Sequence, residues 1–341
     1  MNNILLICRD TPQNTLALTP AITILKRNFP KVKISVVSLY PWIFRNNPSV
    51  FKALQLGGAY SLFSVLREDS YDLAILTKPA FAYAAALYAA RIPKRLMPTT
   101  FYGKFLATQQ IKTQGLPIKK AYLEMLKPLF VFMFPAKERL YTSKQDDACA
   151  TDILQQAGIN KTDKFICIFP AAQKTHLNAT KDFYAKLIDK LSDKRPEIKL
   201  LLTAENKKDL HTLNEIFWLS IKKPSIIRQA LSPELLNAII ARSKGTISGC
   251  TLPSYLSAAL GKKAIVFTPL KAEQFFSLPE SSVPIKPKNN SCCGNCLKDC
   301  QSLCLKDISL EHTLKVFDTI FAPAKKRGIF NEEGTFGFFD N

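Results

Sequence analysis

Short apolar runs alternate with amphipathic segments along most of the chain. In the first half, residues 4–8, 32–39 and 73–77 are apolar runs, which predicts buried strands. Residues 16–29 and 80–90 have the apolar spacing or alanine content of helices. Strand, helix and strand in this order form the unit of a parallel sheet.

The second half repeats this pattern more regularly. Ser232 is a candidate N-cap for one helix, and Gly261 is expected to end another. The predicted strands are 165–169, 199–203, 225–228, 245–248 and 264–268, and the predicted helices are 181–191, 207–219, 233–242 and 253–260. We therefore expect an α/β protein with two Rossmann-like, doubly wound domains that face a cleft. Their predicted extents are 1–160 and 161–325, followed by a tail, 326–341, that returns to the N-terminal domain.

Residues 100–145 have a different character, with many lysines and aromatic residues. A helix is predicted over 119–134, interrupted by Pro128, with Tyr122, Leu126 and Phe130 among the apolar residues on one side. Such a helix rests on a membrane surface or packs on its own domain, and the pattern leaves both open.

The chain lacks an apolar run near the roughly 20 residues of a membrane span. Its first ten residues also lack the basic and small-residue features of a secretory signal. We expect a cytoplasmic protein whose nine cysteines are mostly reduced unless they bind metal.

The charge balance points to an anionic partner. The chain has 47 Lys and Arg against 27 Asp and Glu, a net charge of +20. Nucleic acid, an anionic membrane and phosphorylated substrates all fit this charge. The cations are spread along the chain and no nucleic-acid-binding motif occurs, which argues against a specific nucleic-acid partner.

In parallel sheets, ligands bind at the carboxyl ends of the strands. The loops predicted to hold the site are therefore 9–15, 170–180, 203–206 and 248–254. Neither G-x-G-x-x-G nor G-x-x-x-x-G-K-[ST] occurs, so standard dinucleotide and P-loop sites are not expected.

Four segments resemble glycosyltransferase family 9, the ADP-heptose:lipopolysaccharide heptosyltransferase family. The first two resemble the family's opening and its next strand–helix unit. The third resembles its most specific motif, S-N-D-T-G-P-x-H-x-A-A-A-L-G, and the fourth resembles the cysteine cluster that many members carry. In chain order they are ILLICRDTPQNTLALTPAITILKRNFPKVKISVV, YDLAILTKPAFAYAAALYAARIPKRL, SKGTISGCTLPSYLSAALGKKAIVFTP and CCGNCLKDCQSLCLKDIS.

The resemblance implies a B-type glycosyltransferase fold and an inverting transfer that needs no metal or other cofactor. The N-terminal domain would bind the acceptor, and the C-terminal domain a nucleotide sugar, typically ADP-heptose. The implied acceptor is the lipid-linked, phosphorylated lipopolysaccharide core at the cytoplasmic face of the inner membrane. A peripheral protein that meets an anionic acceptor in an anionic membrane would account for the charge.

The resemblance also places the catalytic base in the first loop. The family's Asp aligns with Asn14, which cannot accept a proton at neutral pH. Asp10, in the same loop, is the predicted base, and a loop-capping role is its alternative. Arg9, Asn14 and Thr15 are predicted to contact substrate.

In the donor loop, the family's D-T-G-P-x-H corresponds to CTLPSY, with Cys250 for Asp, Leu252 for Gly and Tyr255 for His. Backbone N–H groups at the following helix can still hold a diphosphate. An N-cap role is the alternative for Thr251. The residues of this loop predicted to bind substrate are Ser248, Cys250, Thr251, Leu252, Ser254 and Tyr255.

Two further pairs follow the strands of the second half. Lys174 and His176 are candidates for phosphate contact, with an exposed polar loop as the alternative. Glu205 and Asp209 are candidates for contact with the hydroxyls of the sugar or nucleotide. The alternative is that they are acidic residues at a helix N-terminus, where their charge is favourable.

The altered positions leave two hypotheses for the function. One is a divergent transferase, and the other is a family member that binds or assembles envelope glycans without catalysis. The cysteine cluster is either a structural zinc site or a set of reduced thiols, and no catalytic metal is expected. Its candidate ligands are Cys293, Cys296, Cys300 and Cys304.

Overall fold

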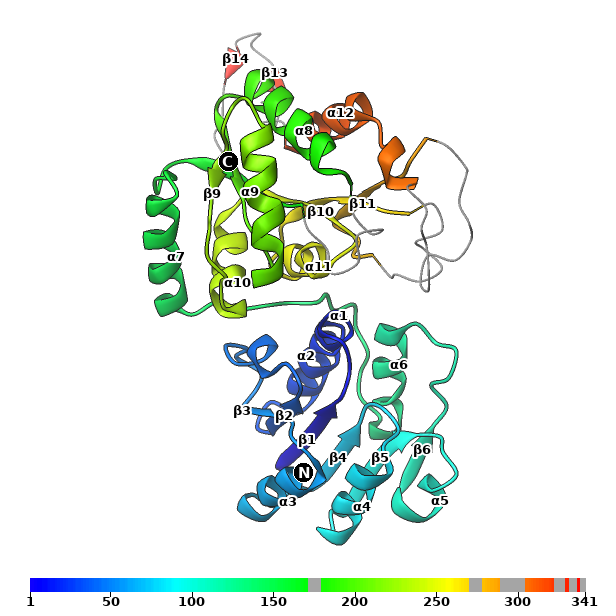
Figure 1. Ribbon diagram of the computed structural model, residues 1–341. Coiled ribbons are helices and arrows are strands. Elements are labelled where there is room, and N and C mark those ends of the chain that lie inside the picture. Colours follow the sequence, from blue (N-terminus) through cyan, green and yellow to red (C-terminus); the bar gives the residue numbers. More distant parts are fainter. Residues whose placement is uncertain (171–178, 270–277, 289–303, 322–328, 331–335, 338–341) are drawn as a thin grey trace.

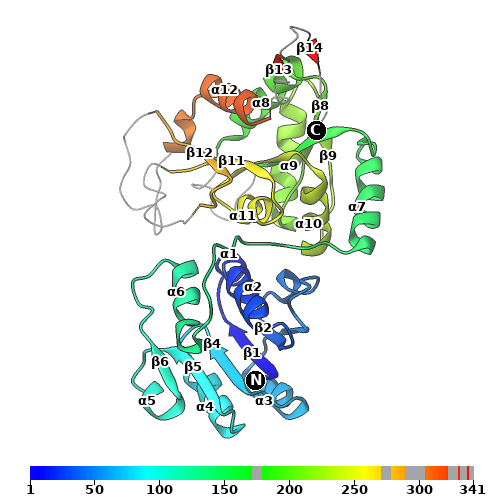
Figure 2. The ribbon, with the colours of Figure 1, turned by 180° about the vertical axis from the view of Figure 1, so that it is seen from behind.

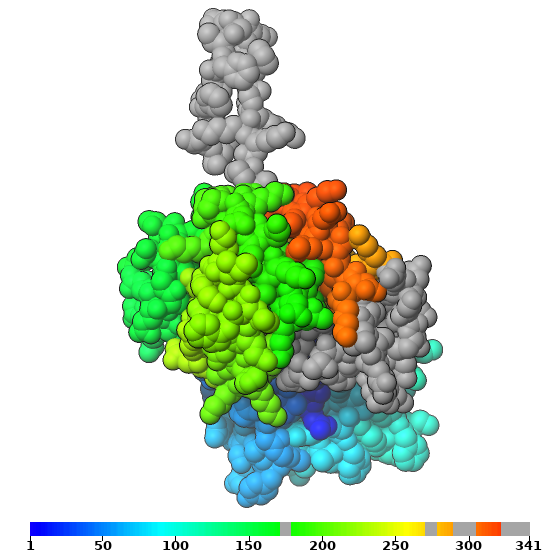
Figure 3. Space-filling view, turned by 45° about the horizontal axis from the view of Figure 1, so that its top comes forward, coloured from blue at the N-terminus to red at the C-terminus, as the bar shows by residue number. Residues whose placement is uncertain are grey.

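The computed structural model describes residues 1–170, 179–269, 278–288, 304–321, 329–330 and 336–337. These residues form two α/β domains, the first coloured blue to teal and the second green to orange in Figure 1. In the space-filling view of Figure 3 the two are separate bodies in direct contact. The expected α/β class with two doubly wound domains is confirmed.

The first sheet has six parallel strands in the order β3-β2-β1-β4-β5-β6. Its strands are β1 (Asn3–Cys8), β2 (Lys33–Ser38), β3 (Lys52–Gln55), β4 (Leu73–Leu76), β5 (Lys94–Pro98) and β6 (Gln109–Ile111). In the central strand β1, Ile4 pairs with Ile34 on one side and Leu73 on the other. Such strands are apolar throughout because helices cover both faces of the sheet.

Helices pack on both faces of this sheet, as Figures 1 and 2 show. One face carries the inward residues Leu5 and Ile7, and the other carries Ile4 and Leu6. The helices are α1 (Pro12–Leu16), α2 (Thr19–Asn28), α3 (Ala59–Glu68), α4 (Phe81–Ala89), α5 (Gly103–Leu106) and α6 (Ile118–Glu124), with 3₁₀ turns η1 (Pro41–Ile43) and η2 (Lys127–Leu129).

The second sheet has six parallel strands in the order β12-β11-β10-β7-β8-β9. Its strands are β7 (Lys164–Phe169), β8 (Ile198–Leu202), β9 (Ser225–Ile226), β10 (Gly245–Gly249), β11 (Lys263–Phe267) and β12 (Ser282–Ile285). Its helices are α7 (Lys144–Gln156), α8 (Lys181–Lys194), α9 (Leu210–Leu219), α10 (Pro233–Arg242), α11 (Leu252–Ala259) and α12 (Leu310–Phe321), with η4 (Lys207–Asp209) and η6 (Cys304–Asp307).

Both sheets have the same topology. Counted within its own domain, each runs 3-2-1-4-5-6, so the strand order reverses between β1 and β4 and again between β7 and β10. The crevice outside the carboxyl ends at such a reversal is the usual ligand site in these folds. The loops after β1, β4, β7 and β10 are therefore the expected positions of the ligand site.

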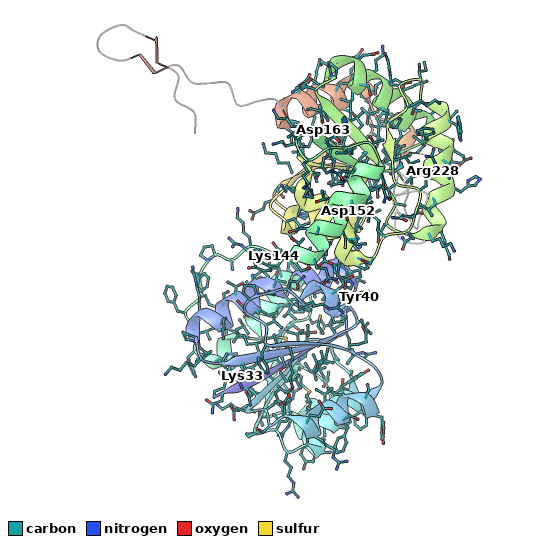
Figure 4. The ribbon with its side chains drawn as sticks, turned by 90° about the vertical axis from the view of Figure 1, so that its left-hand side faces the viewer. Lys33, Tyr40, Lys144, Asp152, Asp163 and Arg228 are labelled. Atoms are coloured by element: carbon teal, nitrogen blue, oxygen red, sulfur yellow. The ribbon has the colours of Figure 1, made fainter. Side chains whose placement is uncertain are left out.

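The chain crosses between the domains before α7, not near residue 160 as expected. The hydrogen bond from Arg242 Nη1 to Thr151 Oγ1, at 2.8 Å, ties α7 to α10 of the second domain. Figure 4 labels Lys144, the first residue of α7, where the two domains meet. The boundary was misplaced because α7 is an amphipathic helix with no strand before it.

Several contacts join the domains. Arg45 pairs with Glu234 at 2.7 Å, and the backbone N–H of Leu140 donates to the carbonyl of Ala259 at 3.0 Å. One continuous hydrophobic core includes β1 and α2 of the first domain together with α10 and α11 of the second. The domains therefore share packed surface as well as polar contacts.

The predicted helix over 119–134 is wrong beyond its first turns. α6 ends at Glu124, because Pro128 lacks an N–H and its ring clashes with a helix that continues. Tyr122 and Leu126 pack inside the domain, whereas Phe130 adopts a left-handed conformation, φ 52°, and is 96% exposed. The apolar side is thus divided between core and surface.

Other differences involve short elements. The expected loop 9–15 contains α1, and β3, β6 and β12 were not anticipated. In the tail, β13 (Ile329–Phe330) pairs with β14 (Phe336–Gly337), and both lie beyond the second domain in Figure 1, away from the first. None of the described helices is long and apolar enough to cross a membrane.

Candidate active site between the domains

A cavity of about 870 Å³ opens where the two domains meet. Its walls come from α1 and the loop before it, the start of α6, the segment before α7, and α11 with the segment before β12. The lining residues are Thr11, Gln13, Asn14, Leu16, Ala17, Pro117, Ile118, Lys119, Lys137, Glu138, Cys250, Tyr255, Ala258, Gly261, Leu278, Pro279, Glu280 and Ser281. This volume is within the range of small-molecule sites.

Asp10 lies at the carboxyl end of β1, and its side chain has no exposed surface. Oδ1 accepts from the backbone N–H of Thr11 at 2.9 Å and from Nδ2 of Asn14 at 2.7 Å. Oδ2 lies 3.0 Å from Nζ of Lys78 and accepts from the hydroxyl of Tyr122 at 3.3 Å. Both carboxylate oxygens are therefore occupied by donors.

This network spans the reversal point of the first sheet. Asp10 follows β1, and Lys78 follows the neighbouring strand β4, so the ion pair connects the two loops that flank the crevice. Burial raises the pKa of the phenol of Tyr122, which therefore stays protonated and remains a donor to Asp10.

Asp10 does not line the cavity, whereas its partner Asn14 does. Arg9 is exposed and lies over the ring of Tyr83, 4.9 Å from the centroid. Thr15 is a buried residue of α1, and its hydroxyl receives a contact from the thiol of Cys8 at 3.7 Å. Of the four first-loop candidates, the structure therefore brings Asn14 to the cavity and keeps the other three away from it.

The donor loop contributes two side chains to the cavity, Cys250 and Tyr255. Burial raises the pKa of the Cys250 thiol to about 12, and it also raises the pKa of the Tyr255 phenol. Both groups are therefore uncharged at neutral pH, which leaves this wall of the cavity without a carboxylate or a cation.

None of the other donor-loop candidates lines the cavity. Ser248 and Ser254 are completely buried, and each hydroxyl donates to a backbone carbonyl, of Gly249 and of Thr251. Leu252 is also buried. Thr251 occupies the N-cap position of α11 without a side-chain cap, and its buried Oγ1 has no partner among the described residues.

The acidic candidates follow β8, two strands from β10 in the same sheet. Burial raises the pKa of Glu205 to about 7, and the charge of Asp209 adds to the rise. Burial also raises the pKa of Asp209, whose Oδ2 has no hydrogen-bond partner among the described residues. Neither residue lines the cavity, so the structure does not bring this pair together with Asn14 or Tyr255.

Several predicted residues lie outside the described part of the chain. These are Lys174, His176, Cys293, Cys296 and Cys300. Within the described residues, no group of three or more His, Cys, Asp and Glu side chains could hold a metal ion.

The sequence reasoning missed five residues that shape this site. Lys78 directly follows a predicted strand, so the strand-end rule that selected the other loops could have found it. Tyr122 was noted for its apolar face, and its hydroxyl partner is 112 residues away in sequence. Lys119, Lys137 and Glu138 line the cavity, and Lys119 pairs with Glu138 at 3.2 Å.

Comparison with protein families gives the class of this protein. The model of glycosyltransferase family 9 (heptosyltransferase) matches residues 59–306. Because this match covers most of the sequence, the chain belongs to that family. It is therefore a glycosyltransferase by class, as the four resembling segments predicted. No curated protein matches the sequence at a significant level.

Solved structures share the fold over nearly the whole chain. A family 9 glycosyl transferase from Veillonella parvula superposes with a TM-score of 0.80 at 16% identity, covering 94% of this chain and 97% of that one. E. coli ADP-heptose lps heptosyltransferase II gives 0.74 at 18% identity, covering 94% and 98%. E. coli heptosyltransferase WaaC, solved with ADP, gives 0.69 at 14%, covering 93% and 99%. At these identities the likeness establishes a shared fold, the B-type arrangement of two domains.

Proposed function

We propose that this protein transfers a heptose-like sugar from an ADP-linked donor to a lipopolysaccharide-core or related envelope glycan. The transfer inverts the anomeric centre and uses no metal or other cofactor. The observation that carries the proposal is the cavity between two doubly wound domains of a family 9 chain, lined from both sides near their strand ends. The similar chains named for ADP-heptose and ADP support the choice of donor.

In the proposed reaction an acceptor hydroxyl attacks the anomeric carbon of the donor. A new carbon–oxygen bond forms on one face as the bond to the diphosphate breaks on the other, and the diphosphate leaves with the electron pair. The hydroxyl proton passes to the carboxylate of Asp10, which acts as general base. For this to occur, Asn14 must turn aside, because its amide occupies Oδ1 of Asp10 and lines the cavity.

The leaving diphosphate needs positive charge. Lys119 and Lys137 line the cavity, and the first turn of α11 offers backbone N–H groups and the partial positive end of the helix dipole. The unpartnered hydroxyl of Thr251, at the N-cap of α11, is a further donor for a phosphate oxygen. The wall formed by Cys250 and Tyr255 adds no negative charge, although Glu138, which pairs with Lys119, and Glu280 also line the cavity.

The proposed setting is the cytoplasmic face of the inner membrane. The net charge of +20 favours an acceptor that carries phosphate and is anchored in an anionic membrane. The protein would bind this membrane peripherally, with a nucleotide sugar and a lipid-linked glycan as its two substrates.

Release of free nucleotide from a panel of donors tests the proposal. The panel contains ADP-heptose, other ADP- and UDP-sugars, GDP-mannose and CMP-linked sugars, each with and without a lipopolysaccharide-core acceptor. We expect saturable binding by thermal shift and acceptor-dependent release of ADP. Binding without release would favour the alternative, a family member that binds envelope glycans without catalysis. The occupied oxygens of Asp10 are the observation in favour of that alternative. No binding of any donor by the folded protein would contradict the transferase and would leave a fold that binds something else.

A further inference from the structure

Helix α4 exposes an apolar face. Its sequence, FAYAAALYA, contains no charged residue, and a helix that is apolar all round is normally buried. Ala84 and Leu87 do pack into the core. On the flank of the helix beside them, however, Phe81 is 61% exposed and Tyr88 is 54% exposed, with exposed alanines next to these rings. Because Phe81 and Tyr88 are two helical turns apart, they lie along one side of α4.

The exposed apolar surface continues onto α5. The ring of Phe81 meets the ring of Tyr102 edge-on, with centroids 5.5 Å apart, which joins the start of α4 to the residue before α5. On either side of Tyr102, Phe101 is 82% exposed and Phe105 is 70% exposed. Four large aromatic side chains thus extend into solvent from α4, from α5 and from the turn before α5. Contiguous apolar surface of this kind marks a binding face.

The charge around this surface has one sign. Residues 73–123, which contain both helices, have eight lysines and arginines and no aspartate or glutamate. Lys78 and Lys119 are paired with carboxylates from elsewhere in the chain. The remaining six form no ion pair among the described residues: Arg91, Lys94, Arg95, Lys104, Lys112 and Lys120.

One cation is built directly into the aromatic face. The guanidinium of Arg95 lies over the ring of Tyr88, 5.3 Å from its centroid, and its Nε donates to the carbonyl of Leu106 at 2.8 Å. Arg95 therefore joins the end of α4 to the end of α5 and holds positive charge beside the exposed rings.

We propose that this face of α4 and α5, defined by Phe81, Tyr88, Phe101, Lys104 and Phe105, is where the protein docks on an anionic lipid bilayer. Aromatic rings settle at the boundary between headgroups and acyl chains, while lysine and arginine attract anionic headgroups. The absence of carboxylates from residues 73–123 favours an anionic bilayer over a neutral one. Helices α4 and α5 lie on the side of the first domain away from the second in both Figure 1 and Figure 2.

This inference rests on the proposed function for the identity of the lipid-linked acceptor. The acid-free segment that contains the face also reaches the cavity, because Pro117, Ile118 and Lys119 belong to it and line the cavity wall. A docked protein would therefore present one continuous basic segment from the bilayer surface to the site of transfer.

Co-sedimentation with vesicles tests the docking face. The probes are vesicles of phosphatidylcholine alone and vesicles that also contain phosphatidylglycerol. We expect the wild-type protein to bind the anionic vesicles and not the neutral ones. The variant Phe81→Ser/Phe105→Ser should lower the partition coefficient by about tenfold, and Lys104→Glu should weaken binding most at low salt.

Matched controls keep the test specific. Trp218→Ser/Ile221→Ser removes two exposed apolar side chains from the second domain, at 70% and 81% exposure, and should leave vesicle binding unchanged. Thermal melting of each variant checks that it is folded. The proposal would be overturned if Phe81→Ser/Phe105→Ser bound anionic vesicles as well as the wild type does, or if the wild type bound neutral vesicles equally well. It would also be overturned if Phe130→Ser lost binding instead. So would displacement of the protein from anionic vesicles by an equal charge of DNA.

Donor turnover separates this inference from the proposed function. With a water-soluble acceptor, Phe81→Ser/Phe105→Ser should release ADP at the wild-type rate, because these rings do not line the cavity. If the wild-type protein turned over no donor but bound anionic vesicles through this face, the proposed function would fail and the docking face would stand. If it turned over donor but did not bind anionic vesicles, the docking face would fail and the proposed function would stand.

Discussion

The amide Nδ2 of Asn14 donates to Oδ1 of Asp10 over 2.7 Å, and of these two side chains it is Asn14 that lines the cavity. The carboxylate of Asp10, which can act as a base, is therefore covered by the amide of Asn14, which cannot. If Asp10 is the base, Asn14 is a movable cover, and removing it should not abolish catalysis.

Asn14→Ala tests this arrangement. The variant loses one hydrogen bond, which costs about 1 kcal/mol of unfolding free energy, but it keeps Asp10 and opens the path to it. We expect kcat to remain at or above the wild-type value, while KM for the acceptor rises through the lost contact. Steady-state kinetics with varied acceptor separates the two parameters. A large loss of kcat would show that Asn14 acts in the chemical step itself.

Lys78 should stabilise the fold because its partner is buried. Lys78→Met leaves the carboxylate of Asp10 without its cation, and we expect the unfolding free energy to fall by about 2–3 kcal/mol. The matched control is Lys52→Met, which breaks the pair with Asp69 at 2.6 Å, where both side chains are about one third exposed. That change should cost less than about 1 kcal/mol. Urea unfolding measures both, and equal losses would contradict the account.

The raised pKa of Glu205 predicts that the unfolding free energy depends on pH. Burial raises its pKa from the ordinary 4.5 to about 7, so between these values the native protein holds a proton that the unfolded chain has lost. The contribution is fully present below the unfolded pKa and is lost as the pH rises through about 7, lowering the unfolding free energy by about 1–3 kcal/mol. In Glu205→Gln this component should disappear.

Urea unfolding of the wild type and Glu205→Gln at a pH near 5 and a pH near 8 measures the effect. Glu197→Gln is the control. A hydrogen bond and ion pair with Arg195 lower the pKa of Glu197, so any contribution of Glu197 to the pH dependence of stability has the opposite sign. An identical pH dependence in the wild type and Glu205→Gln would show that Glu205 titrates normally.

Gly245 is the glycine whose replacement should affect the second sheet most directly. A Cβ at this position would lie 2.4 Å from the carbonyl oxygen of Lys263 and 2.6 Å from the ring of Phe321. Gly245→Ala must therefore displace β10 from β11 and should cost about 1–3 kcal/mol. Gly58→Ala is the control, since nothing lies within 4 Å of its Cβ, and it should change stability by less than about 1 kcal/mol. Thermal unfolding that ranks the two in the reverse order would contradict the packing at β10.

The central strands were predictable because their signal is local. β1, β2, β4, β7, β8 and β11 are buried on both faces and therefore appear in the sequence as largely apolar runs. β10 is equally buried, but its sequence, GTISG, is not an apolar run. The edge strands β3 and β6 carry residues such as Lys52 and Gln109 and are short and partly exposed, so they lack that signal. The helix expected over 119–134 was too long because its apolar spacing continues past Pro128, whereas the proline ends the helix.

The site was less predictable, because its partners come from distant parts of the chain. The strand-end rule selected Asp10, but its contacts with Lys78 and Tyr122 exist only in the folded domain. The burial of Thr15 in α1, Ser248 in β10 and Ser254 in α11 has the same origin. A loop can be located from the sequence, whereas the orientation of its side chains depends on what the rest of the chain packs against it.

The most direct test of the account is ADP release from ADP-heptose, with a lipopolysaccharide-core acceptor, by the wild type, Asp10→Asn and Glu138→Gln. Glu138 is the matched control because it is a carboxylate that lines the cavity, whereas Asp10 must be uncovered. We predict that Asp10→Asn loses at least about 100-fold in kcat while donor binding is unchanged, and that Glu138→Gln retains most of its activity. Full activity in Asp10→Asn, with loss in Glu138→Gln, would contradict the assignment of Asp10 as the base.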